Sequence, residues 1–187
     1  MYRFALVVMT ALAAPALAAP ADYALEAEAS SVSFETDFGP DKITGQMPVS
    51  RADLTLDFQN VANSTVAVTL DVSNARASFV FAAQAMKGPK VLDARTYPEI
   101  TFASTSVRAA GDGATVEGNV TIKGVTRPMT LAATVYRQQG TTPGDLRHLT
   151  VRLTGAVNRS AFGATGWNDM VGDQVRLDIL ARIARVE

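Results

Sequence analysis

Cysteine is absent from this 187-residue chain, and histidine occurs once, at position 148. The absence of cysteine excludes disulfides, zinc–thiolate sites, haem attachment through cysteine and thiol nucleophiles. The fold must therefore be stabilised by burial of apolar side chains. A single histidine also limits metal binding and histidine-based catalysis.

A strong excess of one charge is also missing, since 17 basic residues face 18 acidic residues, for a formal net charge of −1. This balance gives no indication of nucleic acid or of an anionic membrane surface as a partner. The sequence also gives little indication of a catalytic site. His148 lies in a strand-like run, which indicates a surface or edge histidine, and no serine occupies a glycine-x-serine-x-glycine elbow. The carboxylates are scattered singly along the predicted strands, so they nominate no glycosidase-like pair.

The N-terminus carries the pattern of a secretory signal peptide. Arg3 is followed by an almost uninterrupted apolar run, Ala5 to Leu17, and then by small residues at Ala16 and Ala18. We expect cleavage between Ala18 and Ala19, which gives a signal peptide over residues 1–18, one domain over residues 19–187 and a periplasmic location. A membrane anchor is the alternative, but the run is shorter than the roughly 20 residues a spanning helix needs, and Pro15 interrupts it.

The rest of the chain is dominated by apolar residues at every second position, the spacing that places them on one face of a strand. Turn formers separate these runs, among them Gly39-Pro40, Gly111-Asp112 and Lys123-Gly124. Strands in series with short loops indicate an antiparallel all-β barrel or sandwich. The alternating stretches are residues 32–38, 66–72, 116–122, 129–135, 149–157 and 175–183.

One stretch has a helical spacing instead. Between Ala77 and Lys87, the apolar residues Phe79, Ala82, Ala83 and Met86 recur at intervals of three and four, and Gly88-Pro89 ends the pattern. We expect one short helix there and a second helical turn over Val91 to Ala94, before Tyr97-Pro98 restores extended chain.

Six sequence elements resemble those of a known family. A leucine-aspartate pair, Leu92-Asp93, is followed by Tyr97-Pro98 and by the strand Ile100-Thr101-Phe102-Ala103-Ser104. The string Gly118-Asn119-Val120-Thr121-Ile122-Lys123-Gly124-Val125-Thr126-Arg127-Pro128 comes next, and then Arg159-Ser160-Ala161-Phe162-Gly163 and Val171-Gly172-Asp173-Gln174-Val175. In this order and at this spacing the elements are similar to those of YceI-like proteins, over nearly the whole chain after residue 18.

The resemblance implies a lipocalin-like antiparallel β-barrel with one short helical insertion, export to the periplasm, and binding of a polyisoprenoid or similar long apolar molecule. This chain departs from many family members at two polar positions. Where they carry a histidine in the second strand, it has Thr36-Asp37-Phe38, and where they carry an arginine-aspartate pair at the helix start, it has the apolar run Ala77 to Phe81.

The barrel lumen is the natural place for a ligand, because a barrel of about eight strands can hold one elongated molecule when inward side chains do not fill it. Packed core is the competing interpretation for each large apolar residue. Arg159 is the candidate for a polar contact, with a structural salt bridge as its alternative. Lys87, Lys90 and Arg95 suit a phosphate head group chemically but are also typical of a solvated surface. The apolar candidates are Phe34, Phe38, Phe79, Phe81, Met86, Phe102, Phe162 and Trp167.

The sequence thus predicts an exported lipid-binding protein that is not an enzyme. We expect no cofactor, no metal, no nucleic acid partner and no stable membrane insertion, and the sequence sets no oligomeric state. Two alternatives stay open: an enzyme of lipid or isoprenoid metabolism on the same barrel, and a structural or stress-related envelope protein whose lumen is filled by side chains.

Overall fold

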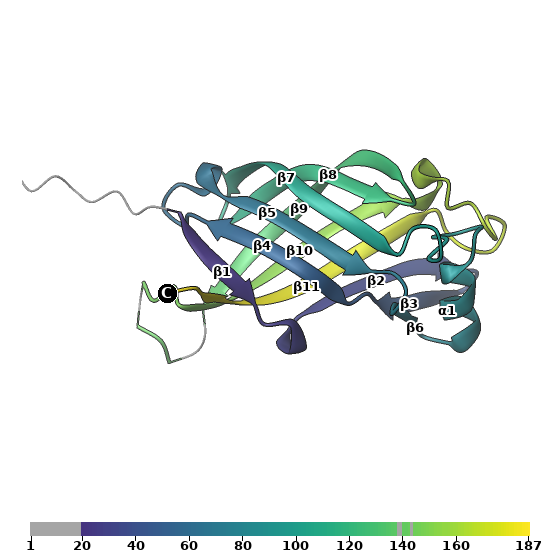
Figure 1. The fold of residues 1–187 in the computed structure, drawn as a ribbon, viewed down its shortest axis with the longest axis horizontal. Helices are drawn as coiled ribbons and strands as arrows, with labels where there is room; N and C mark the ends of the chain where they lie inside the picture. The colour runs from purple at the N-terminus through teal and green to yellow at the C-terminus, as the bar shows by residue number, and fades with distance from the viewer. Residues whose placement is uncertain (1–19, 138–139, 143) are drawn as a thin grey trace, which may run out of the picture.

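The computed structural model describes residues 20–137, 140–142 and 144–187 (Figure 1). The predicted signal peptide and its cleavage site lie outside these residues. The described chain forms a closed, eight-stranded, antiparallel, lipocalin-like barrel with one α-helix at one end. Its elements are β1 (Ala21–Leu25), β2 (Ser31–Phe38), β3 (Asp41–Gln46), β4 (Val49–Leu56), β5 (Thr65–Asp71), β6 (Arg76–Ala77), α1 (Val80–Lys87), β7 (Glu99–Ala110), β8 (Gly113–Ile122), β9 (Val125–Arg137), β10 (His148–Asn158) and β11 (Gln174–Arg185), with 3-10 turns η1 (Ala27–Ala29), η2 (Val61–Asn63) and η3 (Arg159–Phe162).

The sheet closes because its last strand pairs with its first. Strand β11 lies between β10 on one side and both β1 and β2 on the other, with Tyr23 opposite Arg185 and Phe34 opposite Leu177. The turn η1 therefore divides one long barrel strand into β1 and β2, and β3 and β4 are likewise two parts of the next. The two-residue strand β6 pairs with the last two residues of β3, Gly45 and Gln46. Closure leaves most backbone groups of the barrel paired, as a sheet without free edges requires.

The six alternating stretches predicted from the sequence all lie in strands, namely β2, β5, β8, β9, β10 and β11. Strands β1, β3, β4 and the two-residue β6 were not predicted. Strand β3 has Ile43 as its one large apolar residue, so it carries no alternation. In β4 the pairing register shifts between Val49 and Arg51. The inward residues after this shift are therefore no longer an even number of positions from Val49, and the alternation is interrupted.

The predicted helix exists, but it begins later than expected. Ala77 pairs with Gly45 as part of β6, so α1 starts at Val80 and ends at Lys87, before the predicted Gly88-Pro89 stop. The second helical turn predicted over Val91 to Ala94 is wrong. Asp93 adopts a left-handed conformation with φ of 48°, and its N–H donates to Gly88 O at 2.9 Å, so the chain turns back on the helix end.

Two of the family-like sequence elements touch each other. The hairpin between β8 and β9 turns at Lys123 and Gly124, both with positive φ. The ring of Tyr97 lies against Gly124, where a Cβ atom would stand 2.8 Å from Tyr97 Cε1. Glycine is therefore required for the turn and for the aromatic contact. The tyrosine-proline and glycine-valine-threonine elements are therefore in contact in the folded chain.

The barrel end remote from α1 is packed by a small apolar cluster. Tyr23, Leu149 and Ile183 are buried there, and the Phe58 ring meets the Tyr23 ring edge-on at a centroid distance of 5.7 Å. The Tyr23 hydroxyl donates to Leu146 O at 3.0 Å, so its polar atom is satisfied, and burial raises the pKa of that hydroxyl. Both ends of the described chain lie at this end of the barrel (Figure 1).

Candidate functional site

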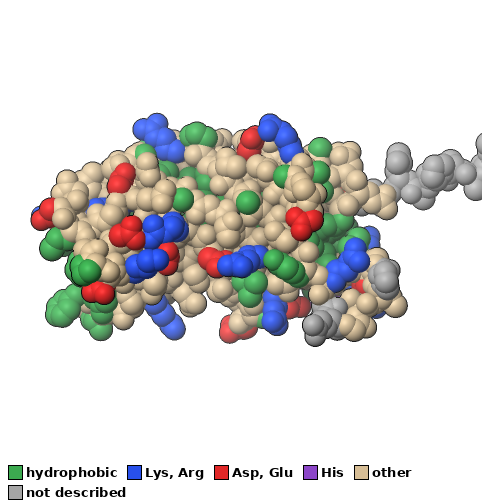
Figure 2. All heavy atoms as spheres, turned by 180° about the vertical axis from the view of Figure 1, so that it is seen from behind, with side chains coloured by type: hydrophobic (Ala, Val, Ile, Leu, Met, Phe, Trp, Pro, Cys, Tyr) green, Lys and Arg blue, Asp and Glu red, His purple; other side chains and the backbone are tan. Residues whose placement is uncertain are grey.

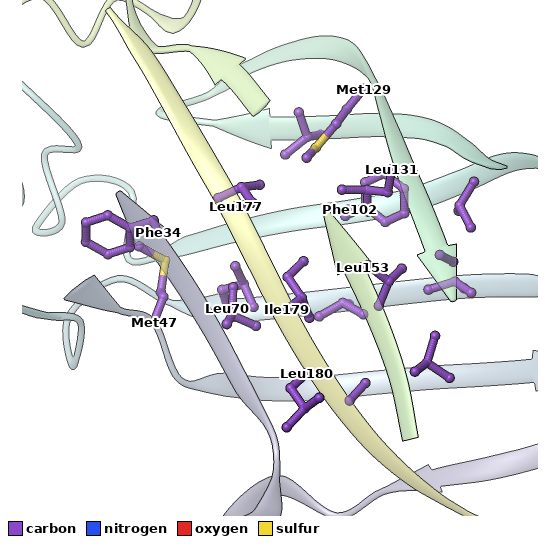
Figure 3. Close-up of a pocket in the computed structure, with 18 of the residues that line it drawn as sticks. Phe34, Met47, Leu70, Phe102, Met129, Leu131, Leu153, Leu177, Ile179 and Leu180 are labelled. Atoms are coloured by element: carbon purple, nitrogen blue, oxygen red, sulfur yellow. The ribbon is translucent and has the colours of Figure 1, made fainter. Parts of the chain in front are cut away.

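The barrel encloses a cavity of about 1420 Å³ that is lined by side chains of all its long strands. This volume exceeds the roughly 300–1,000 Å³ of ordinary small-molecule pockets. Figure 3 shows part of the wall, in which leucine, isoleucine, methionine and phenylalanine side chains from different strands surround one space. Inward residues such as Leu70, Leu153 and Ile179 are only half-buried, because the space they face is not filled by other side chains.

Two glycines help to keep the cavity open. A Cβ atom at Gly118 would lie 2.5 Å from Phe102 Cζ, and one at Gly45 would overlap the ring of Phe34. Each phenylalanine ring therefore lies over the backbone of a neighbouring strand, in the place that a side chain would occupy. These two rings follow the barrel surface because the glycines leave room for them.

All nine predicted site residues line the cavity, at different depths. Phe34 and Phe102 belong to the wall, where Figure 3 labels them. Phe162 is 3% exposed and is part of the packed core, as the competing interpretation held. Met86 is partly buried against that core. The other apolar candidates, Phe38, Phe79, Phe81 and Trp167, come from the β2–β3 hairpin, the start of α1 and the segment before β11.

These four aromatic residues belong to the segments at the helix-bearing end of the barrel (Figure 1). The Phe38 and Phe79 rings are 6.0 Å apart between centroids and are tilted by 48°. Phe38 also forms an isolated bridge with Val171, which joins the hairpin to the segment that carries Trp167. Phe79, Phe81 and Trp167 are exposed, so apolar side chains both line the cavity and reach solvent at this end.

Arg159 is buried, and the structure gives its guanidinium four backbone acceptors. Nε donates to Gly172 O at 2.9 Å, Nη1 donates to Ala164 O and Gly166 O at 2.8 and 2.7 Å, and Nη2 donates to Val171 O at 2.9 Å. Its partners are carbonyls, so the salt bridge considered from the sequence is not what holds it. The side chain fastens the segment that carries Trp167 onto the end of β10, and a direct contact with a ligand stays a prediction.

The three other basic candidates do not line the cavity. Lys87, Lys90 and Arg95 lie in the last turn of α1 and in the chain that leads to β7. Lys90 O accepts a hydrogen bond from Gly166 N at 2.9 Å, which places Lys90 beside the segment of Trp167.

Two polar side chains of the lining are bonded to the protein itself. The Thr36 hydroxyl lies 3.0 Å from both Gly172 O and Gln174 O, so this side chain of β2 has a structural role. Asp57 accepts hydrogen bonds from the Asn60 and Gln59 N–H groups and from Asn63 Nδ2, at 2.8, 2.9 and 3.0 Å. These hydrogen bonds, and above all the one from the Asn60 N–H, hold the pKa of the Asp57 carboxyl below its usual value.

The aliphatic part of the wall was not predicted as part of the site. Leu70, Leu131, Leu153, Leu177 and Ile179 all face the cavity. Their inward direction was visible in the alternation, but the same pattern describes a filled barrel. Whether inward side chains meet each other or leave a space depends on the barrel's diameter and on the glycines beneath the rings, which periodicity does not encode.

Over the described ranges, no three histidine, aspartate or glutamate side chains are grouped closely enough to hold a metal ion. Within the same residues, no helix has the length and apolar character needed to cross a membrane.

The sequence profile of the YceI-like domain matches residues 23–183. A UPF0312 protein of Vibrio parahaemolyticus is 31% identical over 134 residues, which are 70% of this chain and 71% of the relative. A UPF0312 protein of Yersinia pestis is 30% identical over 124 residues, or 65% of each chain.

Solved structures give the same result. The crystal structure of Burkholderia cenocepacia BcnA superposes with a TM-score of 0.76 at 25% identity, over 85% of this chain and 99% of that chain. The Campylobacter jejuni YCEI protein shares the fold, with a TM-score of 0.62 at 15% identity over 100% of this chain and 99% of its own. With the profile match over nearly all described residues, these findings show that the chain belongs to the family of proteins with a YceI-like domain.

Proposed function

We propose that this protein is an exported carrier or store that holds a polyisoprenoid or a similar long apolar molecule inside its barrel, without catalysing a reaction. The observation that carries the proposal is the apolar cavity of about 1420 Å³. Each methylene group that moves from water into such a space gains about 0.8 kcal/mol. A long hydrocarbon tail therefore binds well with few polar contacts.

The family supports the same class of ligand, since the YceI-like fold is associated with hydrophobic ligands. The cavity also argues against the alternative of a barrel filled by its own side chains. Phe34 and Phe102 lie along the wall, and inward leucines and isoleucines remain half-exposed to the space. An enzyme on the same barrel gains no comparable support from the buried polar groups described above, because Arg159, Thr36 and Asp57 are bonded to backbone atoms or to their own turn.

The ligand test is native mass spectrometry of the protein purified from its own periplasm, followed by lipid extraction. We expect a bound species with a long hydrocarbon tail that is released on denaturation. A protein that carries no lipid and that fails to take up prenyl alcohols in solution would contradict the proposal.

The export part of the proposal rests on the N-terminal pattern and is tested separately. N-terminal sequencing of exported material is expected to begin at Ala19, after cleavage behind Ala18. An intact Met1 in the inner membrane fraction would overturn the location and the processing together.

A further inference from the structure

Exposed apolar side chains gather at the helix-bearing end of the barrel. Five residues there, which we call the apolar rim, are Phe79, Val80, Phe81, Trp167 and Met170, and their exposed fractions are 40, 71, 80, 41 and 49%. They account for five of the nine exposed large hydrophobic residues in the described part of the chain. Figure 2 shows green side chains gathered around the end where α1 lies. A contiguous exposed patch of this kind marks a surface that contacts something apolar.

The apolar rim is continuous with the cavity. Phe79, Phe81, Trp167 and Met170 line the cavity as well as facing solvent, whereas Val80 faces solvent alone. The two segments of the rim are held together, since Gly39 N donates to Met170 O at 3.2 Å and the Phe38 ring contacts the Phe79 ring. An apolar path therefore runs from the outer surface at this end into the barrel.

Basic side chains lie in the chain next to the rim residues of α1. Residues 80–98, which include α1 and the chain that follows it, contain Lys87, Lys90 and Arg95 against a single acid, Asp93. Asp169 and Asp173 add two negative charges in the segment of Trp167, so the two segments together are neutral, and the basic excess is confined to residues 80–98. Aromatic and aliphatic side chains that protrude beside lysine and arginine are the arrangement by which peripheral proteins enter the boundary between lipid tails and head groups.

We propose that the apolar rim inserts reversibly into one leaflet of a lipid bilayer, and that the ligand passes between bilayer and cavity at this contact. This inference rests on the proposed function. A bilayer buries the rim and at the same time offers the ligand a continuous apolar path, whereas a protein covering the rim would close the mouth. The contact is peripheral and differs from insertion of a membrane-spanning segment.

Trp167 makes the test direct, because it is the single tryptophan of the chain and belongs to the rim. The wild-type protein is mixed with vesicles of phosphatidylcholine, or of phosphatidylcholine and phosphatidylglycerol, and tryptophan emission is recorded along with cosedimentation. We expect a blue shift of the emission and quenching by lipids brominated on their acyl chains with both kinds of vesicle, because burial of apolar side chains drives the contact.

The test variant is Val80→Asp, and its matched control is Val186→Asp. Val80 is the first residue of α1, where a carboxylate is tolerated, and it does not line the cavity. Val186 is 53% exposed at the other end of the barrel. Val80→Asp is expected to weaken vesicle binding by about tenfold or more, because a carboxylate must then enter the lipid boundary, while Val186→Asp leaves binding unchanged.

Three results would overturn the inference: no vesicle binding by the wild type, equal loss in both variants, or a wild-type dimer in gel filtration that Val80→Asp dissociates. The last would make the rim an interface between two copies of the chain. Uptake of a prenyl alcohol in solution separates this inference from the proposed function. If Val80→Asp still binds the alcohol but no longer binds vesicles, both the inference and the proposed function are supported. If neither the wild type nor the variant takes up the alcohol, the proposed function fails whatever the vesicle assay shows.

Discussion

Replacing Ala52 by phenylalanine is expected to shorten the longest tail that the cavity accepts. Ala52 lies on β4 and faces the cavity, in a row that continues through Val68 and Phe102 to Val120 on the three adjoining strands. The substitution adds a six-carbon ring to the inner wall. At roughly 30 Å³ for each carbon-sized group, the ring removes about 180 Å³ of the 1420 Å³ cavity.

The same arithmetic gives the expected length dependence. The wild-type cavity has room for roughly 40 to 50 carbon-sized groups, or about eight or nine five-carbon prenyl units. Burial of one unit is worth at most about 4 kcal/mol, and ordering of its rotatable bonds offsets much of that. We therefore expect each added unit to strengthen binding roughly five- to thirtyfold until the cavity is full. In Ala52→Phe the plateau should come about one unit earlier.

The assay is competition between prenyl alcohols of increasing length and a fluorescent lipid analogue, with wild type and variant side by side. Ala132→Phe is the control, because Ala132 lies exposed on the outer face of β9. It should leave the length dependence unchanged. Equal plateaus for Ala52→Phe and the wild type, or affinities that do not depend on length, would show that the tail does not occupy the barrel.

Three further predictions concern the wall, the buried arginine and an acid at the surface. Phe102→Asp should abolish lipid retention because a carboxylate in the wall must be desolvated, whereas Lys90→Ala should weaken retention only slightly. Competition binding distinguishes the two variants after circular dichroism has shown that both are folded, and complete loss with Lys90→Ala alone would place the site elsewhere. Arg159→Met removes four hydrogen bonds to carbonyls and should lower the free energy of unfolding by about 3 kcal/mol or more in urea titrations; an unchanged midpoint would refute the structural role. The Arg147 side chain lowers the pKa of Asp145 from 3.8 to about 2. The ionised Asp145 carboxylate therefore stabilises the fold above pH 3.8, and this stabilisation is lost as the pH falls toward 2. Acid titrations of wild type and Asp145→Asn should converge over this range, and a difference in stability that grows there would contradict the prediction.

Much of the fold was readable from the sequence, for a physical reason. The strands that carry alternating apolar residues, such as β5 and β10, have one face toward the cavity and one toward solvent. The polarity of each side chain therefore indicates which face it occupies. Strand β3 has no such contrast, and it forms because β2 pairs along its whole length. Its existence is a property of the closed sheet and is not encoded in its own six residues.

The candidate site was predicted in part for a similar reason. The large aromatic residues, such as Phe34 and Phe102, were identified because few residues of that size occur in the chain. The role of Arg159 was not foreseen, because its four acceptors are carbonyls from a segment that folds back on it. Backbone acceptors exist at every residue, so the sequence carries no trace of which carbonyls converge on a given guanidinium.

The seam of the barrel has a consequence for the rate at which the protein acquires its structure. Tyr23 and Arg185 lie near opposite ends of the chain, yet they face each other across the pairing of β1 with β11. Contacts between residues so distant in sequence form slowly, because the intervening chain must first lose its conformational freedom. Until β11 pairs with it, the edge of β1 that faces β11 stays unpaired. Closure of the barrel is thus set by the pairing of β11 with β1.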